Sequence, residues 1–222
     1  MAADLLDPRN DYVFKRIFAG SPDLAAALIN DLRPSAPPVV TVDILNPTIA
    51  PEELTGKTIV LDVLARDASG RRYNIEMQVR RYANWSSRAL YYLSRLLGSQ
   101  LSAGEGYEDV SGVVGIHILG FDLFPEEDQA LWCFEPRDAH RPHVALGTAL
   151  QWNILELPKA ERLWRDRGLG APEAQGSEHS LRATRAWAAF FEHWAEESIM
   201  ADIQHEPVVK AMGRIIELSA DE

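Results

Sequence analysis

The chain of 222 residues is 46% hydrophobic and 25% charged, which is typical of one globular domain with a helical appendage. It carries no apolar run of membrane-spanning length and no basic-then-apolar leader, and its single cysteine, Cys133, excludes an internal disulfide; we therefore expect a cytoplasmic protein without a membrane partner. The net charge of −11 argues against binding nucleic acid through overall charge, yet residues 56–100 hold eight Lys or Arg against three Asp or Glu.

Residues 10–33 contain the first two predicted helices. Asn10 or Asp11 can cap the first helix, and Pro22 opens the second. Lys15 lies on the first helix, where it can contact a phosphate or remain solvated. The expected apolar face of the first helix consists of Tyr12, Phe14, Ile17 and Phe18.

Residues 39–46 form the next predicted element, a β-strand. Asp43 interrupts its apolar pattern, and Glu52 and Glu53 follow in a loop. Acidic residues are common in such places, so we assign none of the three to a site.

Residues 58–80 predict a β-hairpin around which the rest of the chain is organised. Apolar and polar side chains alternate strictly in both arms, around a Gly-containing turn. With the turn centred on Ser69, Asp62 lies opposite Glu76, at the Cβ separation of about 4.5–5.5 Å typical of cross-strand neighbours. The expected apolar face holds Ile59, Leu61, Val63, Ala65, Ile75, Met77 and Val79, and the polar face holds Thr58, Asp62, Arg66, Arg72, Asn74, Glu76, Gln78 and Arg80.

The carboxylates of Asp62 and Glu76 would repel each other at that separation, so one of them would tend to hold a proton unless a cation lay between them. A hard divalent cation, Mg²⁺ or Mn²⁺, prefers one or two carboxylates together with water and phosphate oxygens. The pair therefore predicts a metal site. The alternative is that both are solvent-facing residues of an exposed strand face.

A helix is predicted over residues 84–101. Arg88, Tyr91, Tyr92 and Arg95 share one of its faces. Arginines at this spacing can follow a phosphate backbone, and tyrosines can hydrogen-bond to it or stack on it. The alternative is an amphipathic surface helix whose arginines extend into solvent.

Residues 110–121 are too continuously apolar for an exposed strand and predict a buried central strand, in which His117 is interpreted as a satisfied core residue. Short strand-like runs recur between residues 131 and 157. Cys133, His140 and His143 fit no standard zinc spacing, so no zinc site is predicted there.

Residues 158–222 are predicted to be helical and are acidic. Residues 168–177 contain the glycines and proline of a flexible break. Residues 181–199 place four aromatic side chains on one helical face: Trp187, Phe190, Phe191 and Trp194.

Five sequence blocks resemble the recombination-promoting nuclease or putative transposase family of the PD-(D/E)XK nuclease superfamily. The superfamily pattern is an aspartate in an apolar strand, a turn, and Glu-x-(Lys/Gln) on the next strand, which Asp62, Glu76 and Gln78 match. The blocks follow the family's order: NDYVFKRIFAG (10–20), KTIVLD (57–62), YNIEMQ (73–78), RALYYLSRLLGSQLSAGEGY (88–107) and VVGIHILGFDLF (113–124).

The resemblance implies an α/β fold: a restriction-endonuclease-like PD-(D/E)XK core, with a mixed sheet of about four or five strands flanked by helices. This nuclease-like domain would span residues 1–160, followed by a helical C-terminal extension over residues 161–222. The acidic residue of the family's first helix lies near the active site and corresponds to Asp11, for which helix capping is the competing role.

The resemblance also implies the site. Asp62, Glu76 and Gln78 would be catalytic, and Mg²⁺ or Mn²⁺ would be held by the two carboxylates and the Met77 carbonyl. Gln78 stands where the superfamily usually has a lysine, although the recombination-promoting family resembles this chain in using glutamine. The expected DNA-binding residues are Arg72, Arg80, Arg88, Tyr92 and Arg95, with Asp11 and Lys15 as accessory residues.

The sequence thus predicts a metal-dependent DNA endonuclease, which hydrolyses phosphodiesters, of the recombination-promoting or transposase-related type. The alternative is a catalytically silent nuclease fold that binds DNA or protein partners in a mobile element or defence system. Gln78 and the negative net charge favour that alternative. The oligomeric state stays open, with a homo-oligomer among the options.

Overall fold

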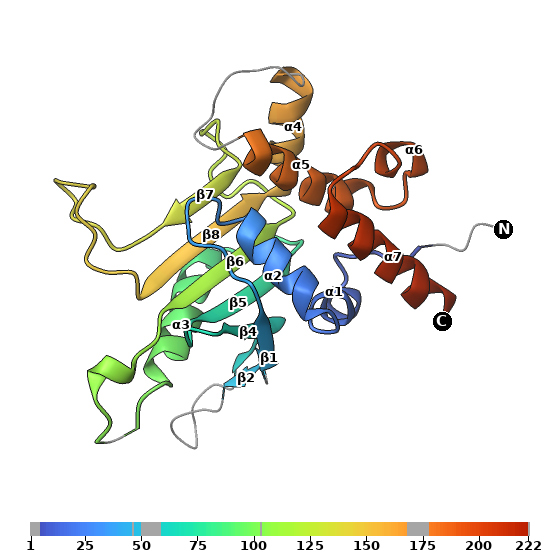
Figure 1. Cartoon of the computed structure of the whole chain (residues 1–222). Helices are drawn as coiled ribbons and strands as arrows, with labels where there is room; N and C mark the ends of the chain where they lie inside the picture. The colour runs from blue at the N-terminus through green and yellow to red at the C-terminus, as the bar shows by residue number, and fades with distance from the viewer. Residues whose placement is uncertain (1–4, 46, 50–58, 103, 168–177, 222) are drawn as a thin grey trace.

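The computed structural model describes residues 5–45, 47–49, 59–102, 104–167 and 178–221, and a mixed sheet runs through its centre (Figure 1). Within the sheet, β5 (Arg72–Gln78), β6 (Val113–Leu119) and β8 (Leu150–Glu156) are parallel, and the other neighbouring strands are antiparallel. A separate short pair joins β2 (Thr48–Ile49) to β3 (Ile59–Val60). The spatial order of the main sheet is β1 (Val42–Leu45), β4 (Val63–Asp67), β5 (Arg72–Gln78), β6 (Val113–Leu119), β8 (Leu150–Glu156) and β7 (Leu131–Phe134).

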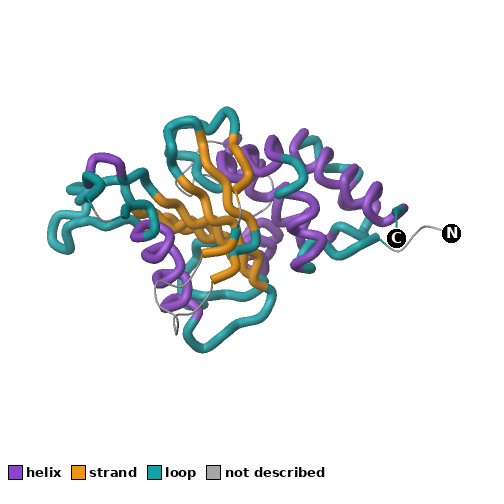
Figure 2. The backbone as a smooth tube through the Cα atoms, turned by 90° about the horizontal axis from the view of Figure 1, so that it is seen from below, coloured by secondary structure: helices purple, strands orange, loops and turns teal. Residues whose placement is uncertain are grey.

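Helices cover both faces of the sheet, so the chain has the expected α/β architecture, with six strands in the described main sheet (Figure 2). One face packs against α1 (Asp11–Phe18), α2 (Pro22–Asp31), α5 (Glu178–His193) and α7 (Glu206–Ala220), and the other against α3 (Trp85–Gly98). The remaining helical segments are the 3₁₀ turn η1 (Tyr107–Asp109), α4 (Leu157–Arg167) and α6 (Glu197–Met200). Among the described residues, we find no helix with the length and apolarity that a bilayer crossing requires.

The main core joins the first and last helices of the chain. Phe14 and Phe18 of α1 lie 4.7 Å apart between ring centroids, and Phe18 lies 5.8 Å from Trp187 of α5. Trp187 is fully buried, and its indole N–H donates to an Asp31 carboxylate oxygen at 2.7 Å. Residues of α5 and α7 therefore share one hydrophobic core with α1 and α2. The expected division at residue 160 stays a prediction.

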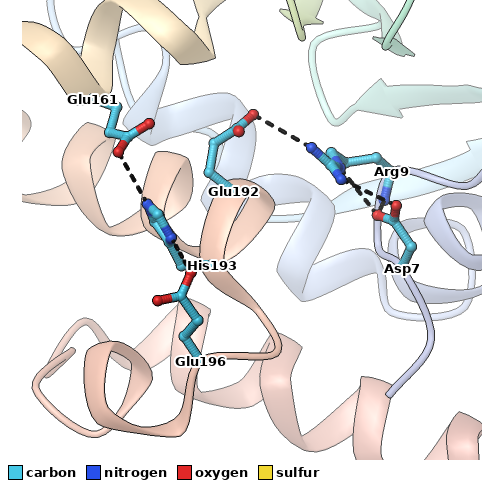
Figure 3. A network of polar contacts seen from close by, with 6 residues as sticks. All are labelled: Asp7, Arg9, Glu161, Glu192, His193 and Glu196. Carbon is cyan, nitrogen blue, oxygen red and sulfur yellow. Dashed lines mark hydrogen bonds and ion pairs between the residues drawn. The ribbon is translucent and has the colours of Figure 1, made fainter. Parts of the chain in front are cut away.

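Ion pairs and hydrogen bonds join the C-terminal end of α5 to α4 and to the segment before α1 (Figure 3). His193 lies between Glu196, at 2.7 Å, and Glu161 of α4, at 3.4 Å. Arg9, from the segment before α1, pairs with Glu192 at 3.6 Å and with Asp7 at 3.1 Å. The N-terminal segment and α4 are thereby held against the same end of α5.

The central hairpin has the predicted register but not the predicted continuity. Val63 pairs with Ile75 and Leu64 with Asn74, as a turn centred on Ser69 requires. The first arm, however, leaves the main sheet before residue 63: Leu61 donates its backbone N–H to the Pro47 carbonyl, and Ile59–Val60 pairs with β2 instead.

This break changes which face the apolar residues occupy. Val63, Ala65, Ile75 and Met77 join the core shared with α1 and α2, as expected. The expectation is wrong for three others, because Ile59 and Leu61 pack on the α3 side and Val79 is 42% exposed. Thr58, Glu52, Glu53 and the break at residues 168–177 lie outside the described residues.

The other expectations for individual elements are mostly confirmed. All residues of β6 are buried, and the strand lies between β5 and β8. Asn10, rather than Asp11, caps α1, because its side chain accepts the Tyr12 N–H. Tyr12 does not belong to the apolar face of α1, since it is largely exposed.

Candidate active site

The break in the first arm places Asp62 beside β5. Because the chain turns away from β5 at this point, the carboxylate of Asp62 takes the position of a strand partner and accepts the backbone N–H of Met77 at 3.1 Å. Asp62 is therefore fixed next to the residue that follows Glu76. Burial raises the pKa of the Asp62 carboxyl, although the Met77 N–H and the Lys15 ammonium oppose the shift.

Glu76 lies on the face of β5 that α3 covers, and its side chain is buried. Asn74, two residues earlier on the same face, donates from its amide nitrogen to Glu76 at 3.3 Å. Burial first, and the Asp62 carboxylate second, raise the pKa of Glu76 to about 7. The charge of Asp62 therefore reaches Glu76 across the hairpin, and the alternative of solvent-facing carboxylates is wrong for Glu76.

Lys15 brings a positive charge to the same place from α1. Its Nζ lies 3.4 Å from an Asp62 carboxylate oxygen. Asp11, one turn earlier on α1, is near enough for its charge to favour the protonated form of Asp62. Both accessory residues predicted from the sequence thus lie within electrostatic reach of Asp62.

Gln78 and Arg88 meet at the end of β5. Arg88 donates to the Gln78 amide oxygen at 3.4 Å, and its guanidinium lies 4.9 Å from the centre of the Tyr92 ring. Although burial favours its neutral form, the Glu76 carboxylate raises the pKa of Arg88. Arg88 therefore lies within the electrostatic reach of Glu76 and in contact with Gln78.

The other predicted DNA-binding residues lie at different places around this centre. Tyr92 is buried against the α3 core, so its ring face is not free for stacking. Arg80 is exposed just after β5, and Arg95 lies half-buried seven residues, or about two helical turns, beyond Arg88. Arg72 shares the face of Glu76 but is four residues away along β5, or about 13 Å.

His117 lies next to Glu76. The sequence predicted His117 as a core residue but did not place it at the site. The two residues pair across β5 and β6, and the His117 ring meets Trp85 of α3 edge-on at 5.2 Å. Burial, together with the charge of Arg88, lowers the pKa of His117 to about 3. Neither ring nitrogen has a hydrogen-bond partner among the described residues, so the expectation of a satisfied histidine is wrong.

The donor set at this centre suits a hard cation. The two carboxylates of raised pKa offer oxygen ligands, which Mg²⁺ and Mn²⁺ prefer to sulfur or imidazole ligands. In the part of the chain that the structure describes, we find no cluster of three or more His, Cys, Asp or Glu that could hold an ion. Protein ligands beyond Asp62 and Glu76 would have to be backbone or amide oxygens.

A comparison with protein-family models identifies the family of the chain. The model of the PD-(D/E)XK nuclease family transposases matches residues 8–222. The chain belongs to this family. The comparison with curated proteins and the comparison with solved structures each gave no match.

The family assignment gives this PD-(D/E)XK chain a nuclease-type function, and the resemblance inferred from the sequence blocks is confirmed. Nucleases of this kind generally use divalent metals and act on nucleic acid. The match extends through α7, so the C-terminal helices are part of the family's sequence as well as of the core.

Proposed function

We propose that this chain is a metal-dependent DNA endonuclease whose centre is formed by Asp62, Glu76, Lys15 and Gln78. The observation that carries the proposal is the buried pair of carboxyl groups at the break of the hairpin, beside a lysine from another element. Uncompensated acids in a buried position destabilise a fold, and perturbed acids of this kind are typical of functional sites.

Asp62 and Glu76 would hold Mg²⁺ or Mn²⁺, with the Met77 carbonyl as the third protein ligand. When bound, the ion would activate water for attack on phosphorus and neutralise charge on the phosphate oxygens. The raised pKa of Glu76 supports this assignment, because a bound cation would favour the ionised carboxylate that burial disfavours.

Lys15 would supply the positive charge that the superfamily usually takes from a lysine at the position of Gln78. Its ammonium group already lies 3.4 Å from Asp62, and α1 holds it there through the buried Phe14 and Ile17. In this role it stabilises negative charge on the reacting phosphate. Gln78 cannot carry charge, and it would orient the attacking water through hydrogen bonds.

DNA would approach over the start of α3 and the end of β5. Arg88 and Arg80 are exposed there and can contact phosphates, while Arg95 extends the same row along α3. Tyr92 would act on DNA only by positioning the Arg88 guanidinium over its ring. Arg72 would contact a more distant phosphate.

A silent nuclease fold that binds DNA or a protein partner is the second candidate. Gln78 in place of lysine and the net charge of −11 favour it. The two functions differ in what Glu76 does: it is required for cleavage in the first and dispensable for binding in both.

The test is plasmid nicking by purified protein in Mg²⁺, Mn²⁺ and EDTA, with DNA affinity measured in parallel. We expect nicking only with a divalent ion, loss of nicking in Glu76→Ala, and DNA affinity retained in that variant because affinity comes mainly from basic residues. DNA binding without nicking in either ion would favour the silent fold instead.

A further inference from the structure

A second polar centre lies on the opposite face of the sheet, in a groove of about 2540 Å³. The segment after α2, the β7–β8 hairpin and α5 form its walls, and Tyr73 and Gln151 belong to its floor. Tyr73 is adjacent to Asn74 in β5, so its side chain points away from the face that holds Glu76. Neither Asp62 nor Glu76 lines this groove.

Arg33 is a charged side chain buried at this groove, with only 5% of its surface exposed. Its Nε donates to the Gln151 amide oxygen at 2.8 Å and its Nη1 to the Tyr73 hydroxyl at 3.4 Å. Both partners are neutral, and in the described ranges no carboxylate forms an ion pair with Arg33. A buried guanidinium without an anion is costly, and burial lowers the pKa of Arg33.

Two carboxylates accept hydrogen bonds from the partners of Arg33, and neither pairs with Arg33 itself. Asp67 accepts the Tyr73 hydroxyl at 2.7 Å, and Glu135 accepts the Gln151 amide N–H at 2.6 Å. These bonds use the Tyr73 hydroxyl proton and one Gln151 amide N–H, so both partners meet the guanidinium with their oxygens; the Gln151 oxygen also accepts from the Asn153 amide at 3.1 Å.

The remaining oxygens of those carboxylates are also engaged. The second oxygen of Asp67 accepts N–H groups of Ser69 and Arg71, and the second oxygen of Glu135 pairs with Arg137 at 2.5 Å. The network thus fixes the Arg33 side chain while leaving its charge without a direct counterion.

Arg71 adds a second guanidinium to the same end of the groove. It is partly exposed, it lines the groove, and its side chain forms no ion pair within the described residues. Its backbone N–H donates to the same Asp67 carboxylate that accepts the Tyr73 hydroxyl, and its positive charge adds to the effect of burial in lowering the pKa of Arg33. Two like charges that converge on one tyrosine repel each other unless an anion lies between them.

We propose that Arg33 and Arg71 form a binding site for the phosphate group of a small ligand, of nucleotide size, on the face of the sheet opposite the nuclease centre. Two planar guanidinium forks match the charge and geometry of a phosphate monoester better than those of a single carboxylate. The groove is large enough to hold the rest of such a ligand beside Gln151. The site does not depend on cleavage activity, so it stands or fails separately from the proposed function.

The experiment is isothermal titration calorimetry of the full chain in EDTA with inorganic phosphate, AMP and citrate. The variants are Arg71→Ala, whose side chain is partly exposed, and Arg33→Lys, which keeps the charge but removes the fork. Arg141→Ala is the control, because Arg141 is exposed on the loop before β8 and does not line the groove. We expect binding of phosphate and AMP, unchanged in the control and about tenfold weaker in each variant, the loss typical of one charge-assisted hydrogen bond.

Three results would overturn the proposal. One is no heat with either phosphate compound. Another is equal affinity of wild type and Arg71→Ala for phosphate and AMP. This result would leave Arg33 a purely structural arginine, and it can be obtained even if Arg33→Lys fails to fold. The third is binding of citrate alone, which would exclude phosphate as the recognised group.

Discussion

Replacing Glu76 with glutamine should make the metal-free protein more stable at neutral and alkaline pH. The pKa of Glu76 rises from its ordinary value of 4.5 to about 7 in the folded protein, because of burial and the neighbouring Asp62. A raised carboxyl pKa means that the folded state binds a proton more tightly than the unfolded state. The stability that the protonated Glu76 contributes to the folded state is present below pH 4.5 and is lost as the pH rises through 7.

The size of the effect follows from the shift. The difference between the ordinary pKa of 4.5 and the folded-state pKa of about 7 corresponds to about 3 kcal/mol in the free energy of unfolding. Since Glu76 is only 9% exposed, solvent screening reduces it little. Glutamine of the same shape cannot ionise and can still accept the Asn74 amide bond. In EDTA, Glu76→Gln should therefore match wild type near pH 4 and exceed it by about 3 kcal/mol at pH 8, or about 6–12 °C in Tm for a chain of this size.

Denaturant unfolding at a series of pH values in EDTA measures this difference. Glu126→Gln is the matched control, because Glu126 is exposed and its removal should leave the pH dependence of wild type. Parallel pH profiles for wild type and Glu76→Gln would contradict the raised pKa of Glu76, since Glu76 would then be no more costly to ionise than an exposed acid.

Two further predictions concern the ion and the DNA. Mn²⁺ at about 100 times its Kd should stabilise wild type by about 2.7 kcal/mol, which is measured as a rise in Tm. The Tm of Asp62→Asn should not change, because the ion binds the folded state through the Asp62 carboxylate. An equal rise in Tm for both proteins would show that the ion binds elsewhere. Arg88→Ala should weaken binding to all DNA sequences similarly and flatten its salt dependence, because it removes a phosphate contact. In a filter-binding titration, Arg141→Ala should change neither the DNA affinity nor its salt dependence. An effect equal to that of Arg88→Ala would contradict a phosphate contact by Arg88.

The sequence was sufficient for those features that depend on local pattern. The alternation around Ser69 predicts the register of Val63 with Ile75, because one face of each strand must be buried. The continuous apolar run of β6 predicts a strand covered on both faces, as observed. The amphipathic pattern of α3 and the aromatic face of α5 follow from helical periodicity in the same way.

The features that depend on distant contacts could not be predicted. The strand break at Asp62 arises because the Pro47 carbonyl takes the Leu61 N–H, and alternation contains no sign of this competition. Lys15 was a candidate for phosphate contact, but its pairing with Asp62 requires the packing of α1 against the sheet. The burial of Asn74 depends on how α3 covers the strands, whereas the sequence placed Asn74 on a polar face. The burial of His117 was predicted, but its pairing with Glu76 depends on the order of β5 and β6 in the sheet.

Moving the lysine from position 15 to position 78 tests whether Lys15 supplies the positive charge of the nuclease centre, because the exchange removes that charge from α1 and restores it on β5. The measurement is the rate of plasmid nicking in Mn²⁺ by wild type, Lys15→Gln and the double variant Lys15→Gln/Gln78→Lys. If Lys15 supplies the charge that Gln78 cannot, Lys15→Gln should lose at least about tenfold in rate, as removal of one transition-state contact does, and the double variant should recover much of it. Absence of nicking by wild type would contradict the proposed nuclease activity, and an undiminished rate in Lys15→Gln would contradict the role of Lys15.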